Sequence, residues 1–155
     1  MDAPARRECH TWYHKFSSSA HMGTEWWYMW ERDVPNLAGN VQNPPPTEVG
    51  ANGAFCDPGQ KTCLAPEWAI LNYVEKEFGP KDYLSVRDEY FDDERGQRTG
   101  YKTRYTELLV GWGHWIGNTI TIRPERRFER SYDVPAYDNG RCRYDPEILT
   151  ERHIR

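Results

Sequence analysis

The amino-acid sequence predicts an all-β fold, an antiparallel up-and-down meander of about six long strands. Three observations predict it: helical periodicity is weak, turn residues separate aromatic and β-branched runs, and polarity alternates along these runs. Several runs exceed the roughly five or six residues that are usual for strands of soluble sheets. The six runs are His10–Phe16, Gly23–Arg32, Glu67–Phe78, Tyr83–Phe91, Tyr101–Ile116 and Asn118–Arg130.

The alternation gives each strand one apolar and one charged face. In the last run Ile120, Ile122, Pro124 and Phe128 fall on one face. The other face carries Thr121, Arg123, Glu125, Arg127 and Glu129. Successive side chains of a strand point to opposite faces, so this pattern places the apolar residues together. The run Glu67–Phe78 leaves two interpretations open, because its apolar spacing suits a short helix as well as a strand.

The connections between the runs alternate in length. Residues 17–22, 79–81 and 117–118 form short connections, whereas 33–66 and 92–100 are longer. A membrane β-barrel has this asymmetry, since one rim carries short turns and the other carries long loops. Its strands need only about 9–11 residues with every second one apolar, so a mean hydropathy of −0.94 is compatible with it. The pattern favours part of a transmembrane β-barrel, incomplete and open as given.

Composition and motifs disfavour several other classes of protein. A net charge of −4 without a basic stripe predicts no nucleic-acid partner. We find no phosphate-binding loop, nucleophile elbow or metal-ligand spacing, so we expect no enzyme activity, no cofactor and no metal. A glycosidase using Glu25, Glu89 or Glu125 would need two carboxyl groups facing across a cleft, and the sequence shows no such pair.

The C-terminal third carries a resemblance to a known family. The stretches that carry it are Gly100–Tyr105, Gly111–Gly117, Ile122–Glu129 and Tyr132–Gly140, preceded by a similar strand and loop in Tyr83–Gly96. Together they resemble the C-terminal hairpins of the outer-membrane β-barrel porins of the OmpL-like group. The resemblance implies a bacterial outer-membrane barrel with more strands than this chain contains, a precursor with a signal peptide, and passive passage of small solutes.

The chain also departs from the family pattern. The family continues into a final membrane strand that ends on an aromatic residue, whereas this chain ends in the charged stretch 141–155. We therefore expect a fragment, with residues 1–140 a partial barrel containing a long extracellular-type loop at 34–66, and 141–155 an atypical, disordered tail. No apolar segment of a signal peptide follows the N-terminus, so the outer-membrane location is expected of the parent protein.

The candidate site residues are charged side chains that would line a pore. The alternative is a solvated sheet face with cross-strand ion pairs worth roughly 0.2–1 kcal/mol each. A separate expectation is a disulfide between Cys56 and Cys63, which bracket a Pro-Gly turn in the longest loop. The expected pore-lining residues are Glu25, Arg87, Glu89, Glu107, Arg123, Glu125, Arg127 and Glu129.

The sequence leaves two functions open. The first is the fragment of a porin-like barrel, with outer-membrane lipid and small solutes as partners and self-association through the open sheet edges. The second is a soluble β-sandwich that binds carbohydrates through its many tryptophan and tyrosine side chains, which amount with phenylalanine to 14% of the chain.

Overall fold

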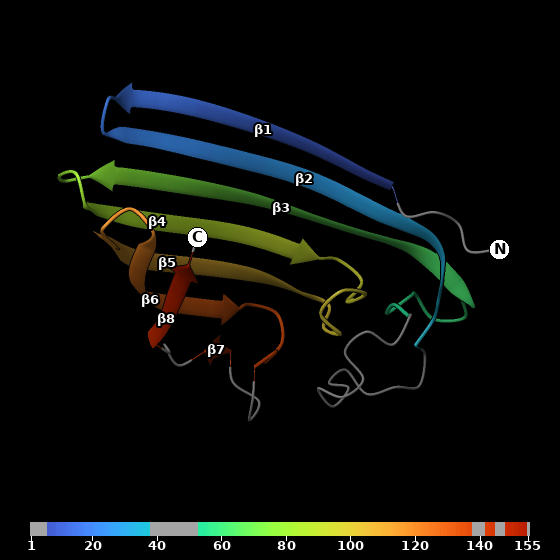
Figure 1. The fold of residues 1–155 in the computed structure, drawn as a ribbon. Coiled ribbons are helices and arrows are strands. Elements are labelled where there is room, and N and C mark those ends of the chain that lie inside the picture. Colours follow the sequence, from blue (N-terminus) through green and yellow to red (C-terminus); the bar gives the residue numbers. More distant parts are fainter. Residues whose placement is uncertain (1–5, 38–52, 138–141, 145–147, 155) are drawn as a thin grey trace.

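The computed structural model describes residues 6–37, 53–137, 142–144 and 148–154, of which the last two strands are described by their backbone alone. These residues form one antiparallel sheet and no helix, as predicted (Figure 1). Its first six strands follow one another as a meander: β1 (Arg6–Ser17), β2 (Ala20–Pro35), β3 (Thr62–Glu77), β4 (Asp82–Asp93), β5 (Thr103–Ile116) and β6 (Ile120–Ser131).

The six predicted runs correspond to these six strands. The run Glu67–Phe78, for which a helix was an open alternative, is the strand β3. β2 and β3 are longer than predicted, because Val34 pairs with Cys63 and Pro35 with Thr62 beyond a bulge at Asp33, whose φ is 58°. The connection between them therefore spans 36–61, within the predicted loop 34–66, and its residues 38–52 lie outside the described part of the chain.

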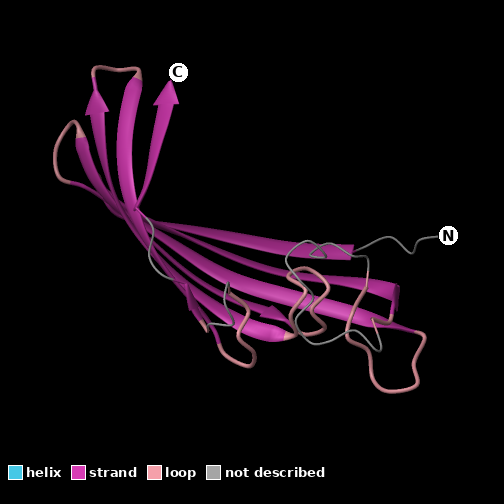
Figure 2. Ribbon diagram, turned by 90° about the horizontal axis from the view of Figure 1, so that it is seen from below, coloured by secondary structure: helices cyan, strands magenta, loops and turns pink. Residues whose placement is uncertain are grey.

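The sheet is strongly curved and its connections are sorted by length (Figure 2). The two-residue turn after β1, the turn after β3 and the turn after β5 lie at one end of the sheet, on the left in Figure 1. The longer connections after β2, β4 and β6 lie at the other end. Alternate connections of an antiparallel meander join opposite ends of the strands, so the predicted alternation of lengths gathers the short turns at one end and the long loops at the other.

Two further strands fall within residues 141–155, for which the sequence predicts disorder. β7 (Arg143–Tyr144) pairs with β6 at Glu129 and Arg130, and β8 (Ile148–Ile154) pairs with β6 over Ile120–Arg126. The physical reason is that the outer edge of β6 offers unpaired N–H and C=O groups to any extended segment that reaches it. β1 forms the opposite edge of the sheet.

The long-loop end holds the small hydrophobic cluster of the described residues. Val34, Ala54 and Ala65 are buried there against Cys56 and Cys63. Beside this cluster, the Asp93 carboxylate accepts hydrogen bonds from the backbone N–H groups of Gln97, Arg98 and Thr99 and from the Thr99 hydroxyl, at 2.8–3.1 Å. The connection between β4 and β5 is thereby folded around a single buried carboxylate.

In the connection between β4 and β5, substitution of one glycine should be strongly destabilising. Gly96 has a φ of 67°, and a Cβ there would lie 2.8 Å from the backbone nitrogen of Lys102. We expect Gly96→Ala to lower the free energy of unfolding by about 2–3 kcal/mol, since strain and a backbone clash add. Gly59→Ala is the matched control: its φ is 85° with open space around it, so only about 1 kcal/mol is expected. Equal losses in denaturant titrations of the two variants would refute the clash.

Candidate functional site: the charged face of the sheet

The strand register brings all eight predicted pore-lining residues to one face of the sheet. Glu89 pairs with Glu107 and Glu107 with Glu129, which aligns three glutamates across β4, β5 and β6. Arg87 and Arg127 follow in the next row, on either side of Leu109. We call this side the charged face; it also carries Glu25, Arg123 and Glu125.

Glu107 lies at the centre of an ion-pair network on the charged face. Its carboxylate accepts hydrogen bonds from Arg87 Nη2 and, at 2.5 Å, from Arg127 Nε. Arg87 also reaches Glu89 at 3.2 Å, and Arg127 reaches Glu129 at 2.9 Å. The Glu107 side chain is only 8% exposed. Its two guanidinium partners therefore hold a carboxylate that the curvature of the sheet largely removes from solvent.

The remaining predicted residues share this face but not the network. Arg123 Nε lies 2.6 Å from Glu125, and the Glu125 side chain packs over Gly111, where a Cβ would lie 3.0 Å from its Cγ. Glu25 is separated from Glu89 by Leu71 on β3, and its nearest cation is Arg7 at 3.4 Å. Five of the predicted residues thus form one network, two form a separate pair, and Glu25 stands apart.

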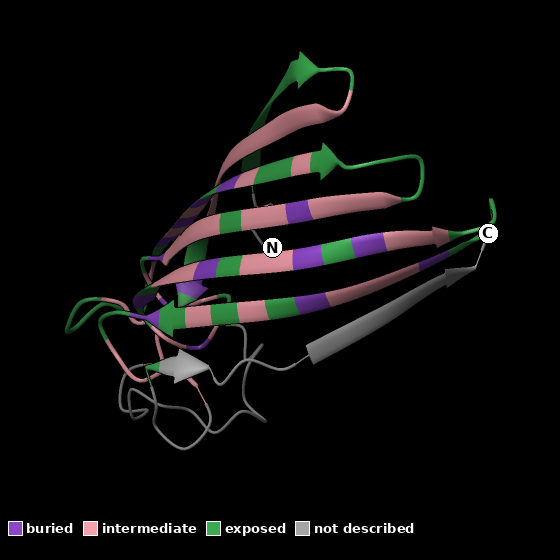
Figure 3. Ribbon diagram, turned by 90° about the vertical axis from the view of Figure 1, so that its left-hand side faces the viewer, coloured by how far each residue is buried: buried purple, intermediate pink, exposed green. Residues whose placement is uncertain are grey.

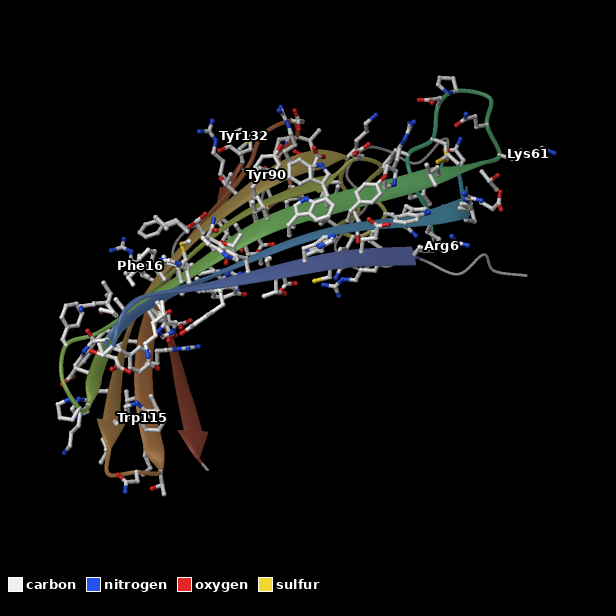
Figure 4. The ribbon with its side chains drawn as sticks, turned by 90° about the horizontal axis from the view of Figure 1, so that it is seen from above. Arg6, Phe16, Lys61, Tyr90, Trp115 and Tyr132 are labelled. Carbon is white, nitrogen blue, oxygen red and sulfur yellow. A yellow bond between two sulfur atoms is a disulfide. The ribbon has the colours of Figure 1, made fainter. Side chains whose placement is uncertain are left out.

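The opposite side of the sheet, which we call the apolar face, exposes large hydrophobic side chains. Trp12 is 57% exposed, Trp112 49%, Leu108 43% and Phe128 42%, whereas Glu67 on the charged face is 3% exposed. Figure 3 shows burial alternating along β3 to β6, and Tyr90 and Tyr132 project from the outer side of the bend in Figure 4. Further exposed members of the apolar face are Phe16, Leu64, Ile70, Val74, Ile116 and Ile120.

The apolar face also carries polar side chains, and those near its middle have partners. Thr24 Oγ1 donates to Asn72 Oδ1 at 2.7 Å, and Asn72 Nδ2 donates to Asp88 Oδ2 at 3.0 Å, so these three neighbours bond one another. Arg126 places its guanidinium carbon 5.1 Å from the ring centroid of Phe128. Mutual hydrogen bonding and cation–π contact reduce the cost of polar groups on an otherwise apolar surface.

Sequence reasoning missed a row of aromatic rings on the charged face. Ring centroids are 5.7 Å apart for Trp27 and Phe91, 5.8 Å for Phe91 and Tyr105, and 6.3 Å for Tyr105 and Tyr137. The signal was present in the phase of each strand, because Phe91 lies two residues from Glu89 and Tyr105 two residues from Glu107. Only the register between strands turns these separate positions into a row.

A disulfide and ionic contacts hold the connections at the long-loop end. Cys56 and Cys63 form a disulfide, as the sequence predicts, whereas Cys9 and Cys142 are free and exposed. The Asp57 carboxylate accepts hydrogen bonds from Arg95 Nη1 at 2.9 Å and Nη2 at 3.1 Å. The backbone N–H of Phe55 donates to the Arg95 carbonyl at 2.8 Å. The connection after β2 is thereby attached to the connection after β4.

The contact between Asp57 and Arg95 should depend on pH. Hydrogen bonds from Arg95, together with its charge, hold the pKa of Asp57 below its ordinary 3.8. A depressed carboxyl pKa adds stability above the unfolded-state pKa, and this is lost as pH falls through the folded-state pKa. We therefore expect the Asp57–Arg95 contact to weaken as the pH falls below 3.8. In a carboxyl NMR titration, Arg95→Gln should return the Asp57 pKa towards 3.8, whereas Lys102→Gln should move it less. Equal shifts would contradict the pairing.

Among the described residues, no group of three or more His, Cys, Asp and Glu side chains is arranged to hold a metal ion. The described part of the chain likewise contains no helix that is long and apolar enough to cross a membrane.

Comparison of the chain with protein-family models, with curated proteins and with solved structures found no match. The resemblance to the OmpL-like porins therefore stays a prediction.

Proposed function

We propose that this chain is part of a porin-like β-barrel of a bacterial outer membrane, whose apolar face meets lipid and whose charged face lines a water-filled passage for small solutes. The observation that carries the proposal is the reversed polarity of the two faces. Glu67, Glu107 and Glu125 are at most 8% exposed, whereas Trp12 and Trp112 are about half exposed. A water-soluble sheet buries its apolar face against a second layer.

In the part of the chain that the structure describes, no second sheet and no helix covers the apolar face. Large uncovered apolar surfaces mark contacts with a membrane or another protein. In hydrocarbon every backbone polar group must be bonded, and hydrogen-bonded strands meet this requirement except at the two edges of an open sheet. Further strands or another copy of the chain would complete the barrel at those edges.

The strand dimensions support the same proposal. The shortest of the six meander strands has 12 residues, which corresponds to about 40 Å at roughly 3.3 Å per residue. A tilt of about 40° reduces its height to roughly 30 Å, enough to cross the apolar band of about 25 Å. Large aromatic side chains lie near both ends of the apolar face, with Tyr28, Trp30 and Tyr132 towards the loops and Phe16 and Trp112 towards the turns. Aromatic residues favour the two membrane–water interfaces.

The charged face supports the passage of solutes. Opposed arginines and glutamates around Glu107 would place a transverse field in the lumen and filter solutes by charge. The carbohydrate-binding alternative stays a prediction; its two-layer sandwich would require a second sheet to cover the apolar face.

The test is folding and transport with and without a membrane environment. We expect a strand spectrum in far-UV circular dichroism and a heat-modifiable gel mobility in detergent micelles, but neither in plain buffer. Liposomes containing the refolded chain should swell in isotonic solutions of small solutes. Cooperative unfolding of a strand signal in plain buffer, together with quenching of tryptophan fluorescence by glycans, would contradict the barrel. It would favour the soluble carbohydrate-binding protein.

A further inference from the structure

The aromatic row on the charged face already binds cations of its own chain. The guanidinium carbons of Arg7 and Arg98 lie 5.4 and 5.6 Å from the ring centroid of Trp27. A third guanidinium, that of Arg87, lies 5.9 Å from the ring of Tyr73 on the same face. The face of an aromatic ring attracts organic cations through its quadrupole, most strongly where water is excluded. These contacts show which chemistry the rings of this face accommodate.

A pocket of about 240 Å³ opens at the far end of the row. Three rings line it, those of Phe91, Tyr105 and Tyr137. Tyr105 and Tyr137 meet edge to face with an interplanar angle of 83°, so the pocket presents aromatic surface from two directions. Tyr105 is held in place by a hydrogen bond of 2.9 Å from its hydroxyl to Thr99 Oγ1. This arrangement resembles the walls of an aromatic cage for a small cation.

The charged wall of the same pocket has an excess of carboxylates. Glu89, Glu107 and Glu129 line it together with Arg127. Arg87, outside the lining, pairs with Glu89 and Glu107, so three carboxylates face two guanidinium groups. A cation entering the pocket would find aromatic faces for its alkyl or planar groups and carboxylates for its charge. A neutral molecule of the same shape gains only the first of these, and an anion is repelled by the second.

We propose that this pocket binds small organic cations, such as quaternary ammonium or guanidinium compounds, as they pass through the barrel. The inference rests on the proposed function and extends it by naming the class of solute. Choline fits the described chemistry, with a compact trimethylammonium group for the rings and a positive charge for the glutamates.

Calorimetric titration of the chain in detergent micelles tests the proposal. The probes are choline chloride and 3,3-dimethyl-1-butanol, which replaces the charged nitrogen by carbon and keeps the shape. At constant ionic strength, choline is expected to bind at least about tenfold more tightly than the neutral isostere. Equal binding of the two compounds, or binding of glucose or maltose in preference to choline, would overturn the proposal.

Variants connect the binding to the pocket. Tyr105→Leu and Glu89→Gln should each weaken choline binding about tenfold, whereas Tyr105→Phe keeps the ring and should lose less than Tyr105→Leu. Tyr13→Leu and Glu75→Gln change an aromatic and an acidic residue of the charged face outside the pocket, and should leave choline binding unchanged. Equal loss in the pocket variants and these controls would contradict the assignment.

Failure of this inference and failure of the proposed function have different signatures. If the chain folds in micelles and liposomes swell, but choline shows no advantage over its isostere, the pocket assignment falls and the barrel remains. If choline binds with the expected preference to a chain that folds in plain buffer, the barrel falls and the cation pocket remains.

Discussion

Ile70→Arg is expected to lower the free energy of unfolding in micelles or bilayers by about 2–4 kcal/mol. Ile70 lies near the middle of β3 on the apolar face, where it is 37% exposed. If that face meets lipid, the arginine side chain would stand at the depth where a charge costs most. Denaturant titration followed by gel mobility in detergent measures the loss.

The adjacent residue provides the control. Leu71 lies on the charged face, 8% exposed, between Glu25 and Glu89 on the neighbouring strands. Leu71→Arg should cost less than half as much as Ile70→Arg, because its charge meets two carboxylates beside a wet lumen. If the sheet stood in water with its apolar face uncovered, the order would be reversed, since Leu71 is 8% exposed and Ile70 37%. The reverse order would exclude the membrane orientation.

Glu107→Gln is expected to reduce the cation-over-anion permeability ratio about fivefold at low salt. Glu107 is the carboxylate between Arg87 and Arg127, so its neutralisation leaves two guanidinium groups with one partner fewer. Two unit charges about 4 Å apart in water interact by about 1 kcal/mol, which corresponds to this factor. Reversal potentials across planar bilayers in a KCl gradient measure the ratio, and the effect should shrink at 1 M salt.

The control for this prediction lies on β4, the strand next to that of Glu107. Asp88 belongs to the apolar face, where it accepts the hydrogen bond from Asn72. Asp88→Asn removes one carboxylate outside the proposed lumen and should leave the permeability ratio unchanged. An equal change in both variants would mean that the permeability ratio depends on the total charge of the chain and not on the residues that line one face.

Much of the fold could be predicted because alternation along a single strand is visible in the sequence. In β6, Ile120, Ile122 and Phe128 share one face, and Arg123, Glu125, Arg127 and Glu129 share the other, so both faces could be assigned without any neighbour. The end of β2 and the beginning of β3 could not be predicted, because both depend on the pairing of Val34 with Cys63 beyond a bulge. The β-strands within 141–155 also depend on a neighbour, the edge of β6.

The site was predicted in part for the same reason. The phase of each strand placed Glu107 and Arg127 on the charged face, but the network around Glu107 needed the register between β4, β5 and β6. The aromatic row was missed because Trp27 and Phe91 lie on strands that are not neighbours in the sheet. Tyr137 lies beyond the end of β6, where alternation gives no information.

The central claim is that neighbouring residues of one strand face lipid and water. Trp26 and Trp27 test it most directly, since Trp26 lies beside Ile70 on the apolar face and Trp27 beside Ala69 on the charged face. Two chains, each retaining one of these tryptophans with the others replaced by phenylalanine, are refolded into bilayers containing brominated lipid. We expect brominated lipid to quench Trp26 strongly and Trp27 weakly, and aqueous acrylamide to give the opposite order. Equal quenching of the two by brominated lipid, or quenching of both by acrylamide alone, would contradict it.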